Sequence, residues 1–261
     1  MLEGIDHAYA IMNDILVAGH DISLHDSVLE KVLYRAKSYN PKLRVRKRQV
    51  PYVGHIISAE GLKPDPEKVR AIKEMPPPTT KEDVRRFLGS IQYLAKFLPM
   101  LAEVETPLRE LTKRDVFVHW DAPQAEAFQR LKDLCCTEPV QAFYDVKKET
   151  TIQCDVSKNA VSAVLLQEGR PIAYASRKLR ESELNWAPIE KEMLAIVFSA
   201  HKFREYILGK ATLVQINHQL LETILRKPMS VAPLRLQAMI LKLSGFDLKV
   251  EYLPRKKTDP S

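Results

Sequence analysis

The hydrophobic period of this chain changes near residue 150, and that change constrains the fold more than any other feature of the sequence. Before it, apolar residues recur every three or four positions, as in the segment 84–95, which predicts amphipathic helices. After it, residues 150–155, 160–166 and 171–176 form short apolar runs separated by turn residues, which predicts strands. The chain is therefore expected to combine a helical part with a part built on a sheet.

The region beyond residue 150 has the element order of an α/β unit. Three strands are followed by further elements at helix and strand spacing: a helix at 188–208, a strand at 211–216, helices within 219–243 and a strand at 246–252. Strands interleaved with long helices predict a mixed sheet with flanking helices. A boundary is expected near residues 140–148.

The first half is predicted to hold small strands and several helices. Its elements are a hairpin at 8–18 with a turn at Asn13-Asp14, a helix at 24–39, a strand at 50–58, and helices at 64–75, 84–95, 101–113 and 124–136. Three consecutive prolines, 76–78, must end the helix before them, because proline lacks the backbone N–H that a helix interior needs. The fold class is therefore α+β followed by α/β.

Composition excludes several protein classes. The chain is 45% hydrophobic and 28% charged, as in ordered globular proteins, and its 8 glycines in 261 residues exclude collagen-like and glycine-rich classes. The 40 Lys and Arg outnumber the 33 Asp and Glu, which favours a polyanionic partner without proving one. Three cysteines without metal-ligand spacing predict reduced, buried thiols. With neither a signal peptide nor a membrane span in the sequence, we expect an intracellular protein without a membrane partner.

Oxygen ligands follow three predicted elements of the second half. Asp155 ends the first strand, Glu192 lies on the first turns of the long helix, and Asn217 and His218 follow the fourth strand. Hard cations such as Mg²⁺ prefer such ligands, and a pair of them can clamp the two oxygens of a phosphodiester cleavage. Taken singly, the same residues also fit a turn and a solvated helix face.

Eight stretches together carry a more specific signal. In chain order they are Met12–Val17, Tyr52–Val69, Arg86–Tyr93, Gln153–Ser157, Gly169–Leu179, Glu190–Val197, Lys202–Leu208 and Ile216–Gln219. With these motifs the chain resembles the reverse transcriptase–ribonuclease H region of gypsy-class LTR retrotransposon pol polyproteins. The motifs keep the family order over nearly the whole chain.

The resemblance implies four segments. They are a polymerase palm remnant at 1–60, helical thumb at 61–114, linker or packing segment at 115–146, and a ribonuclease H-like domain at 147–261 that is truncated at its C-terminus. It also implies RNA-directed DNA polymerisation and metal-dependent hydrolysis of RNA in RNA/DNA hybrids as the ancestral activities.

The sequence departs from the family at the residues that hold metal. The family's polymerase motif carries two aspartates, and here the pair reads Asn13-Asp14. In the hydrolase site, Asp155 and Glu192 match the first two ligands for Mg²⁺ or Mn²⁺, and Asn217 replaces a third aspartate, with His218 beside it. We therefore expect no polymerase activity, and weak or absent hydrolysis.

Nucleic-acid contacts are expected from a basic run, from the palm motif and from the hydrolase sheet. The residues are Lys42, Arg44, Arg46 and Lys47, then Tyr52, Gly54 and His55, and finally Arg177 and Lys178. Lysine and arginine on phosphates give affinity that does not depend on base sequence. The alternative for the basic run is a solvated surface strand.

The expected function follows from both lines of reasoning. The chain is interpreted as a fragment of a retrotransposon reverse transcriptase/ribonuclease H, with an RNA/DNA hybrid or duplex nucleic acid, and the rest of the pol polyprotein, as partners. The alternatives left open are a non-catalytic nucleic-acid-binding module and an inert remnant of a decaying element.

Overall fold

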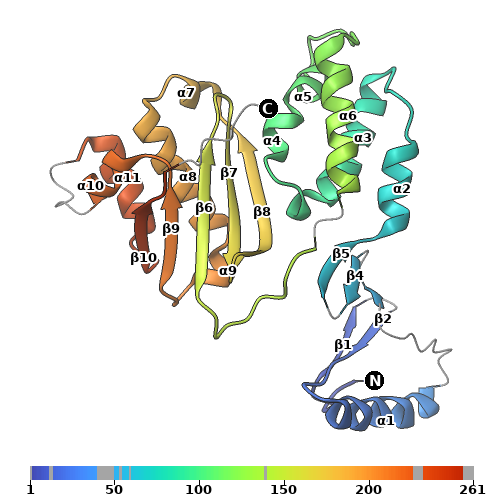
Figure 1. The fold of residues 1–261 in the computed structure, drawn as a ribbon. Helices are drawn as coiled ribbons and strands as arrows, with labels where there is room; N and C mark the ends of the chain where they lie inside the picture. Colours follow the sequence, from blue (N-terminus) through green and yellow to red (C-terminus); the bar gives the residue numbers. More distant parts are fainter. Residues whose placement is uncertain are drawn as a thin grey trace. The chain divides into compact units, whose positions relative to one another are not determined.

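The chain forms two compact units in this computed structural model, Met1–Asp65 and Pro66–Ser261 (Figure 1). The structure describes residues 2–11, 14–39, 50–52, 55–58, 60–137, 140–225 and 232–254. The expected thumb, linker and hydrolase segments thus lie almost entirely within the second compact unit. Their division into three domains stays a prediction.

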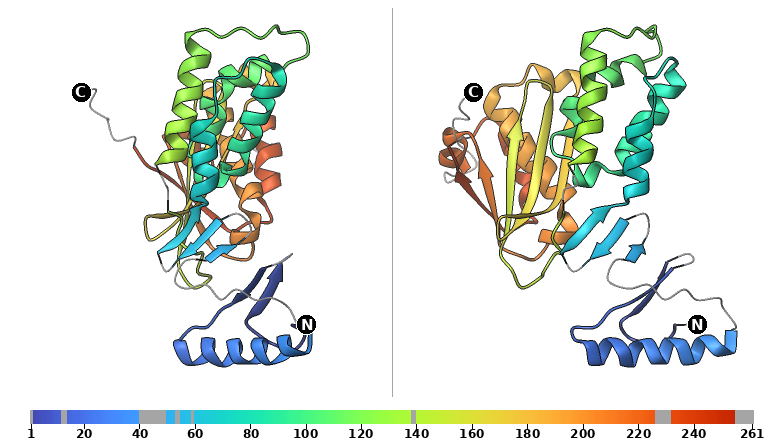
Figure 2. Two further views of the ribbon diagram at one scale, coloured as in Figure 1. Left: turned by 90° about the vertical axis from the view of Figure 1, so that its right-hand side faces the viewer. Right: turned by 45° about the vertical axis from the view of Figure 1, so that its right-hand side comes forward.

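A hairpin and one helix build the core of the first unit. Strands β1 (Ala8–Ile11) and β2 (Asp14–Val17) pair antiparallel, as the sequence predicts. Helix α1 (Ile22–Tyr39) lies beside them and buries Val28 and Val32 with Ile5 (Figure 2). The apolar stripe of α1 therefore has the small hairpin as its packing partner.

A three-stranded antiparallel sheet completes the first unit. It consists of β3 (Val50–Tyr52), β4 (His55–Ser58) and β5 (Gly61–Pro64), in that order. The sequence predicted a single strand over 50–58 and a helix from Pro64. The structure corrects both predictions. Residues 50–52 and 55–58 form two separate strands, and Pro64 ends β5. The helix begins at Pro66, because a proline at the first helical position loses no hydrogen bond.

The second unit opens with a helical part. Its elements are α2 (Pro66–Glu74), α3 (Lys81–Tyr93), the 3₁₀ turn η1 (Ala95–Phe97), α4 (Leu101–Val104), α5 (Thr106–Leu111) and α6 (Ala122–Cys136). Thr80 and Asp83 form a capping box at the start of α3, an arrangement that is worth about 1 kcal/mol. The helix expected over 101–113 is two short ones, because Pro107 cannot continue the first.

Aromatic rings fill the core of this helical part. Phe87 and Phe97 are almost fully buried, and the Phe87 and Phe128 rings lie 4.5 Å apart, centroid to centroid. Trp120 meets Phe128 edge-on at 5.6 Å. Tyr93, at the end of α3, is 45% exposed and lies outside this buried core.

The second half of this unit is a five-stranded mixed sheet with the order β10-β9-β6-β7-β8. The strands are β6 (Thr150–Val156), β7 (Ala160–Gln167), β8 (Arg170–Lys178), β9 (Thr212–Ile216) and β10 (Leu248–Tyr252). The first three are antiparallel, whereas β9 runs parallel to β6 and to β10. Glu168 and Gly169 both have positive φ, which suits the two-residue turn that joins β7 to β8. We call residues 150–252 the sheet domain.

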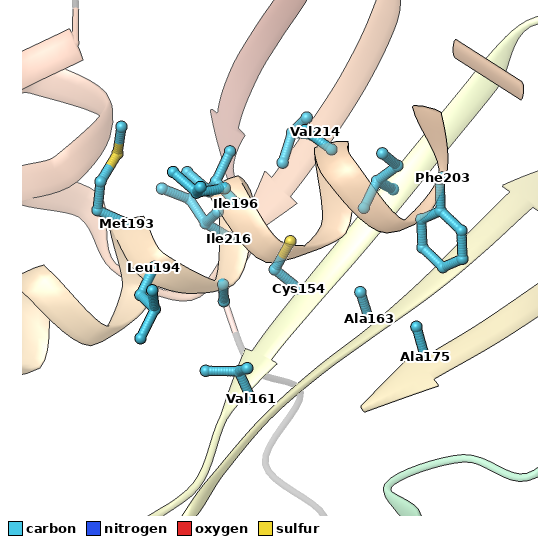
Figure 3. Packing of buried hydrophobic residues seen from close by; sticks show 14 of the residues in the cluster. Cys154, Val161, Ala163, Ala175, Met193, Leu194, Ile196, Phe203, Val214 and Ile216 are labelled. Atoms are coloured by element: carbon cyan, nitrogen blue, oxygen red, sulfur yellow. The ribbon is translucent and has the colours of Figure 1, made fainter. Parts of the chain in front are cut away.

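Helix α8 (Pro188–Lys202) covers one face of the sheet and supplies most of its core. The remaining helices are α7 (Glu181–Leu184), α9 (Arg204–Ile207), α10 (Gln219–Leu225) and α11 (Leu234–Leu243). Figure 3 shows Met193 and Ile196 of α8 above Cys154 and Val161 of the strands. The helix predicted over 188–208 is interrupted at Phe203, the C-cap of α8.

The helical part packs directly on the sheet domain, beside β7 and β8. The backbone N–H of Ala102 in α4 donates to Ser176 Oγ at 2.9 Å, and Lys178 forms an ion pair with Glu110 of α5. Figure 1 shows α4 next to β8. The sheet is thus contacted by α8 and by the helical part.

The expected fold class is confirmed, with a mixed sheet, flanking helices and a helical part ahead of them. Among the described helices, none combines the length and the apolar character that crossing a bilayer requires.

Two neighbouring leucines of α10 test the core assignment. Leu221 is fully buried and Leu220 is 64% exposed. Leu221→Ala should lower the free energy of unfolding by about 2–5 kcal/mol, because it removes buried methyl groups and leaves a cavity. Leu220→Ala is the matched control and should stay within about 0.5 kcal/mol. Urea unfolding of both variants makes the measurement, and equal losses would contradict the assignment.

Candidate functional site

Asp155 and Asn217 meet where two parallel strands end. Gln153 of β6 is the register partner of Gln215 of β9. Asp155 and Asn217, each two positions further along the chain, therefore lie at the same edge of the sheet. The Asn217 Nδ2 donates a hydrogen bond to Asp155 Oδ1 at 3.1 Å. The predicted convergence of these two residues is therefore present in the structure.

Glu192 approaches the same region from α8. Its Oε2 atom is buried. Burial is the main cause that raises the pKa of the Cys154 thiol to about 12; the hydrogen bond with Ser199 acts against it, and the negative charges of Glu192 and Asp155 contribute to the rise. Both carboxylates are therefore near enough to Cys154 to affect its thiol. Cys154 itself lies 3.3 Å from Ser199 Oγ, in the core.

His218 stands next to Asn217 but forms no hydrogen bond with a carboxylate in the described part of the chain. Its backbone carbonyl accepts from the N–H of Leu221, at the start of α10. Its ring Nδ1 is buried without a hydrogen-bond partner among the described residues. His218 thus lies at the edge of the site and is not hydrogen-bonded to it.

Asp155 and Asn217 line a cavity of about 220 Å³. Next to them, Gln153 Nε2 donates to Gln215 Oε1 at 2.8 Å, so two pairs of polar side chains bridge β6 and β9. Met100, from the helical part, also lines this cavity and has a left-handed φ of 50°. Sequence reasoning missed Met100 because no local pattern links it to the sheet. It also missed Gln153 and Gln215, although strand alternation places Gln153 on the same face as Asp155.

These residues do not fit a pair of divalent cations. Among the described residues, no group of three or more His, Cys, Asp or Glu side chains is arranged to hold a metal ion. Asp155 and Glu192 provide two negative charges, and Asn217 directs an N–H donor, not an oxygen, at Asp155. A rotated amide would offer its oxygen but would add no charge. The set of possible metal ligands therefore has one carboxylate fewer than it would have with an aspartate at position 217.

Two predicted nucleic-acid contacts have partners within the chain. Arg177 donates to both carboxylate oxygens of Glu183, at 2.7 and 3.0 Å, and Lys178 pairs with Glu110. These pairs connect β8 to α7 and to the helical part, a role that sequence reasoning did not foresee. As nucleic-acid contacts, Arg177 and Lys178 stay predictions.

The remaining predicted residues belong to the first unit. His55 lies half-buried on β4, opposite Tyr52 of β3. Outside the described residues lie Asn13, Lys42, Arg44, Arg46, Lys47 and Gly54, as do the side chains of Asp14 and Tyr52.

Comparisons with known proteins identify a matching family and several proteins that are similar to this chain. Residues 120–214 match the family described as the RNase H-like domain found in reverse transcriptase. Over 259 residues the chain is 33% identical to the retrovirus-related Pol polyprotein from transposon 297 of Drosophila melanogaster, covering 96% of this chain and 24% of that protein. It is 38% identical over 232 residues to the Pol polyprotein from transposon opus of the same organism, covering 81% and 23%.

A third similar protein comes from a fungus. The transposon Tf2-3 polyprotein of Schizosaccharomyces pombe is 30% identical over 260 residues, covering 95% of this chain and 20% of that protein. The chain therefore spans about a quarter or less of the length of these relatives.

Solved structures of a foamy viral protease–reverse transcriptase share the fold. One, in complex with double-stranded DNA, has a TM-score of 0.80 at 20% identity and covers 100% of this chain and 48% of that one. Another, in complex with an RNA/DNA hybrid, has a TM-score of 0.77 at 20% identity and covers 100% and 38%. At this level of identity the likeness establishes the fold alone.

The cysteines report on the folding of the site region. Burial raises the pKa of the Cys135 and Cys154 thiols to about 12, whereas Cys136 is exposed. Because the thiolate is the reactive form, iodoacetamide at neutral pH should label Cys136 in the native protein, and should label the other two only after unfolding. Peptide mass spectrometry with and without guanidinium measures this. Rapid native labelling of Cys154 would contradict the packing of β6 on α8.

Proposed function

This chain is related to the reverse transcriptase–ribonuclease H region of gypsy-type retrotransposon Pol polyproteins, and on that premise we propose that its sheet domain acts on RNA/DNA hybrids. We propose further that hydrolysis of the RNA strand is weak or absent in this sequence. The hydrogen bond from Asn217 Nδ2 to Asp155 Oδ1 is the observation that carries this proposal.

The physical argument concerns charge. The relationship suggests divalent metal ions, which in such enzymes stabilise the charge that develops on the attacking and leaving oxygens of a phosphodiester. Asp155 and Glu192 are the residues that would hold them here. Asn217 contributes no charge, and its N–H group satisfies Asp155 in the place where a cation would do so. Hydrolysis is therefore limited by weak metal binding, while binding of the hybrid need not be.

Two observations support nucleic acid as the partner. The foamy viral proteins of similar fold were solved with double-stranded DNA and with an RNA/DNA hybrid. The chain also carries a net charge of +7, and lysine and arginine on phosphates give affinity that falls steeply with salt. The rest of a Pol polyprotein is a further partner, since the relatives are several times longer than this chain.

DNA polymerisation by this chain is not part of the proposed function. Asn13 stands where the family motif that the chain resembles has an aspartate, which removes one negative charge from the polymerase pair. Asp14 alone cannot balance two divalent ions.

A cleavage assay tests the proposal directly. A labelled RNA/DNA hybrid is incubated with Mg²⁺ or Mn²⁺ and with the native chain, Asn217→Asp or Glu192→Ala. The native chain should cleave slowly or not at all, and Asn217→Asp should raise the rate about tenfold or more, which is about 1.4 kcal/mol of activation free energy. Glu126→Ala, on the exposed side of α6, is the control for loss of a carboxylate.

The outcomes separate three conclusions. Native cleavage that disappears in Glu192→Ala would show a working hydrolase and would contradict the impaired site. Recovery in Asn217→Asp supports a complete scaffold that lacks one charge. If no variant cleaves but the native chain binds the hybrid, the sheet domain is a non-catalytic binding module.

Stability gives a readout that does not depend on catalysis. Asn217→Asp replaces a hydrogen-bond donor by a second carboxylate beside Asp155, so without metal it should lower the free energy of unfolding by about 1–3 kcal/mol. Mg²⁺ should restore part of this loss, because a ligand that binds only the folded state stabilises it. Thermal unfolding in EDTA and in Mg²⁺ measures both effects. Asn185→Asp, at an exposed position, should respond to neither condition, and a Mg²⁺-insensitive Asn217→Asp would argue against a metal site here.

A further inference from the structure

A second concavity lies on α8, away from the Asp155–Asn217 site. It has a volume of about 430 Å³ and shares no lining residue with the cavity beside Asp155. We call it the α8 groove. Along α8 it reaches His201 and Lys202, nine and ten residues beyond Glu192 in the sequence. At about 1.5 Å per residue, this part of the groove is about 14 Å from Glu192 along the helix axis.

The floor of the α8 groove is made of apolar side chains that are mostly covered. Leu194, Val197 and Phe198 form it, at the three- and four-residue spacing of one helix face. Leu194 and Val197 are each only 8% exposed. The Arg177 guanidinium lies over the Phe198 ring, 5.7 Å from its centroid. The floor therefore presents little apolar surface to a ligand.

The rim of the groove is positively charged. It carries Arg177, Arg180, Lys202 and Lys242, with Glu183 as the one carboxylate among the lining residues that the structure describes. The cations come from different elements: Arg177 from β8, Arg180 from the start of α7, Lys202 from α8 and Lys242 from α11. Four elements thus place positive charge around one concavity.

Glu183 balances only part of this charge. Its burial favours the neutral acid, but the hydrogen bonds from Arg177 and the Arg180 backbone, with the charges of both arginines, outweigh burial and lower the pKa of Glu183. Glu183 is therefore ionised and neutralises one arginine. Lys202 and Lys242 are exposed, and no carboxylate in the described part of the chain pairs with them.

We propose that the α8 groove binds the phosphate backbone of nucleic acid, as a contact separate from the Asp155–Asn217 site. The inference rests on the proposed function and adds to it the surface that holds the duplex. A contact of this kind positions the duplex and carries no base specificity. Because it is independent of Asn217, it persists where hydrolysis does not.

The surface favours phosphate over an acidic peptide. A peptide would need apolar area for its anchoring side chains, but Leu194 and Val197 are almost buried and the Arg177 guanidinium lies over the half-buried Phe198 ring. The exposed groups are ammonium and guanidinium ions, which are suited to phosphate oxygens.

Salt-dependent binding tests the groove. The full chain is titrated with a fluorescent RNA/DNA hybrid at several salt concentrations, as native protein and as the Lys202→Gln/Lys242→Gln double variant. The slope of log affinity against log salt should become shallower by about 2, since each lost phosphate contact removes about 0.9. Lys31→Gln/Lys37→Gln, two exposed lysines of α1, makes the same charge change as a matched control and should leave the slope nearly unchanged.

Each other result overturns the inference in a distinguishable way. If the native chain binds the hybrid and the double variant keeps the native slope, the groove is not a contact, while the proposed function stands. If the native chain does not bind the hybrid at low salt, both fail. If poly-glutamate, but not hybrid, loses affinity in the double variant, the groove serves an acidic protein instead of nucleic acid.

Discussion

The packing of α8 on the sheet is the interaction on which the rest of the second unit depends. Because side chains alternate along a strand, burying Ile152 and Cys154 against α8 turns Gln153 and Asp155 to the opposite face. The parallel register of β6 and β9 places Asn217 at the edge of the sheet where Asp155 lies, and the two side chains form a hydrogen bond there. The geometry of the candidate site is thus a consequence of the apolar core, and it survives a change of the polar residue at position 217.

That independence explains how a site can lose charge without loss of the fold. An asparagine in place of an aspartate keeps the size of the side chain and donates to Asp155, so one oxygen of this half-buried carboxylate has a hydrogen-bond partner. Under the proposed function, an asparagine at position 217 therefore favours stability in the absence of metal at the expense of metal affinity.

The sequence predicted those elements whose periodicity is local. The three antiparallel strands and the long helix that begins at Pro188 follow from apolar spacing, and the structure confirms them, with the helix ending earlier than predicted. It could not predict contacts made by residues distant in the chain, such as the Ala102–Ser176 hydrogen bond that joins the helical part to β8. In the candidate site, the carboxylates were found through motifs, whereas Met100 lines the cavity only because the helical part folds back onto the sheet.

The Asp155–Asn217 site and the α8 groove of the sheet domain differ in charge more than in shape. Asp155 and Glu192 are both carboxylates, and a polyanion approaches negative charge closely only if cations offset the repulsion. Around the α8 groove, four cations face one ionised glutamate, so a polyanion is attracted there without any metal. If phosphates are held at the groove, the strength of nucleic-acid binding and the rate of hydrolysis are set by different residues. Under the proposed function, the asparagine at position 217 then weakens hydrolysis without releasing the hybrid.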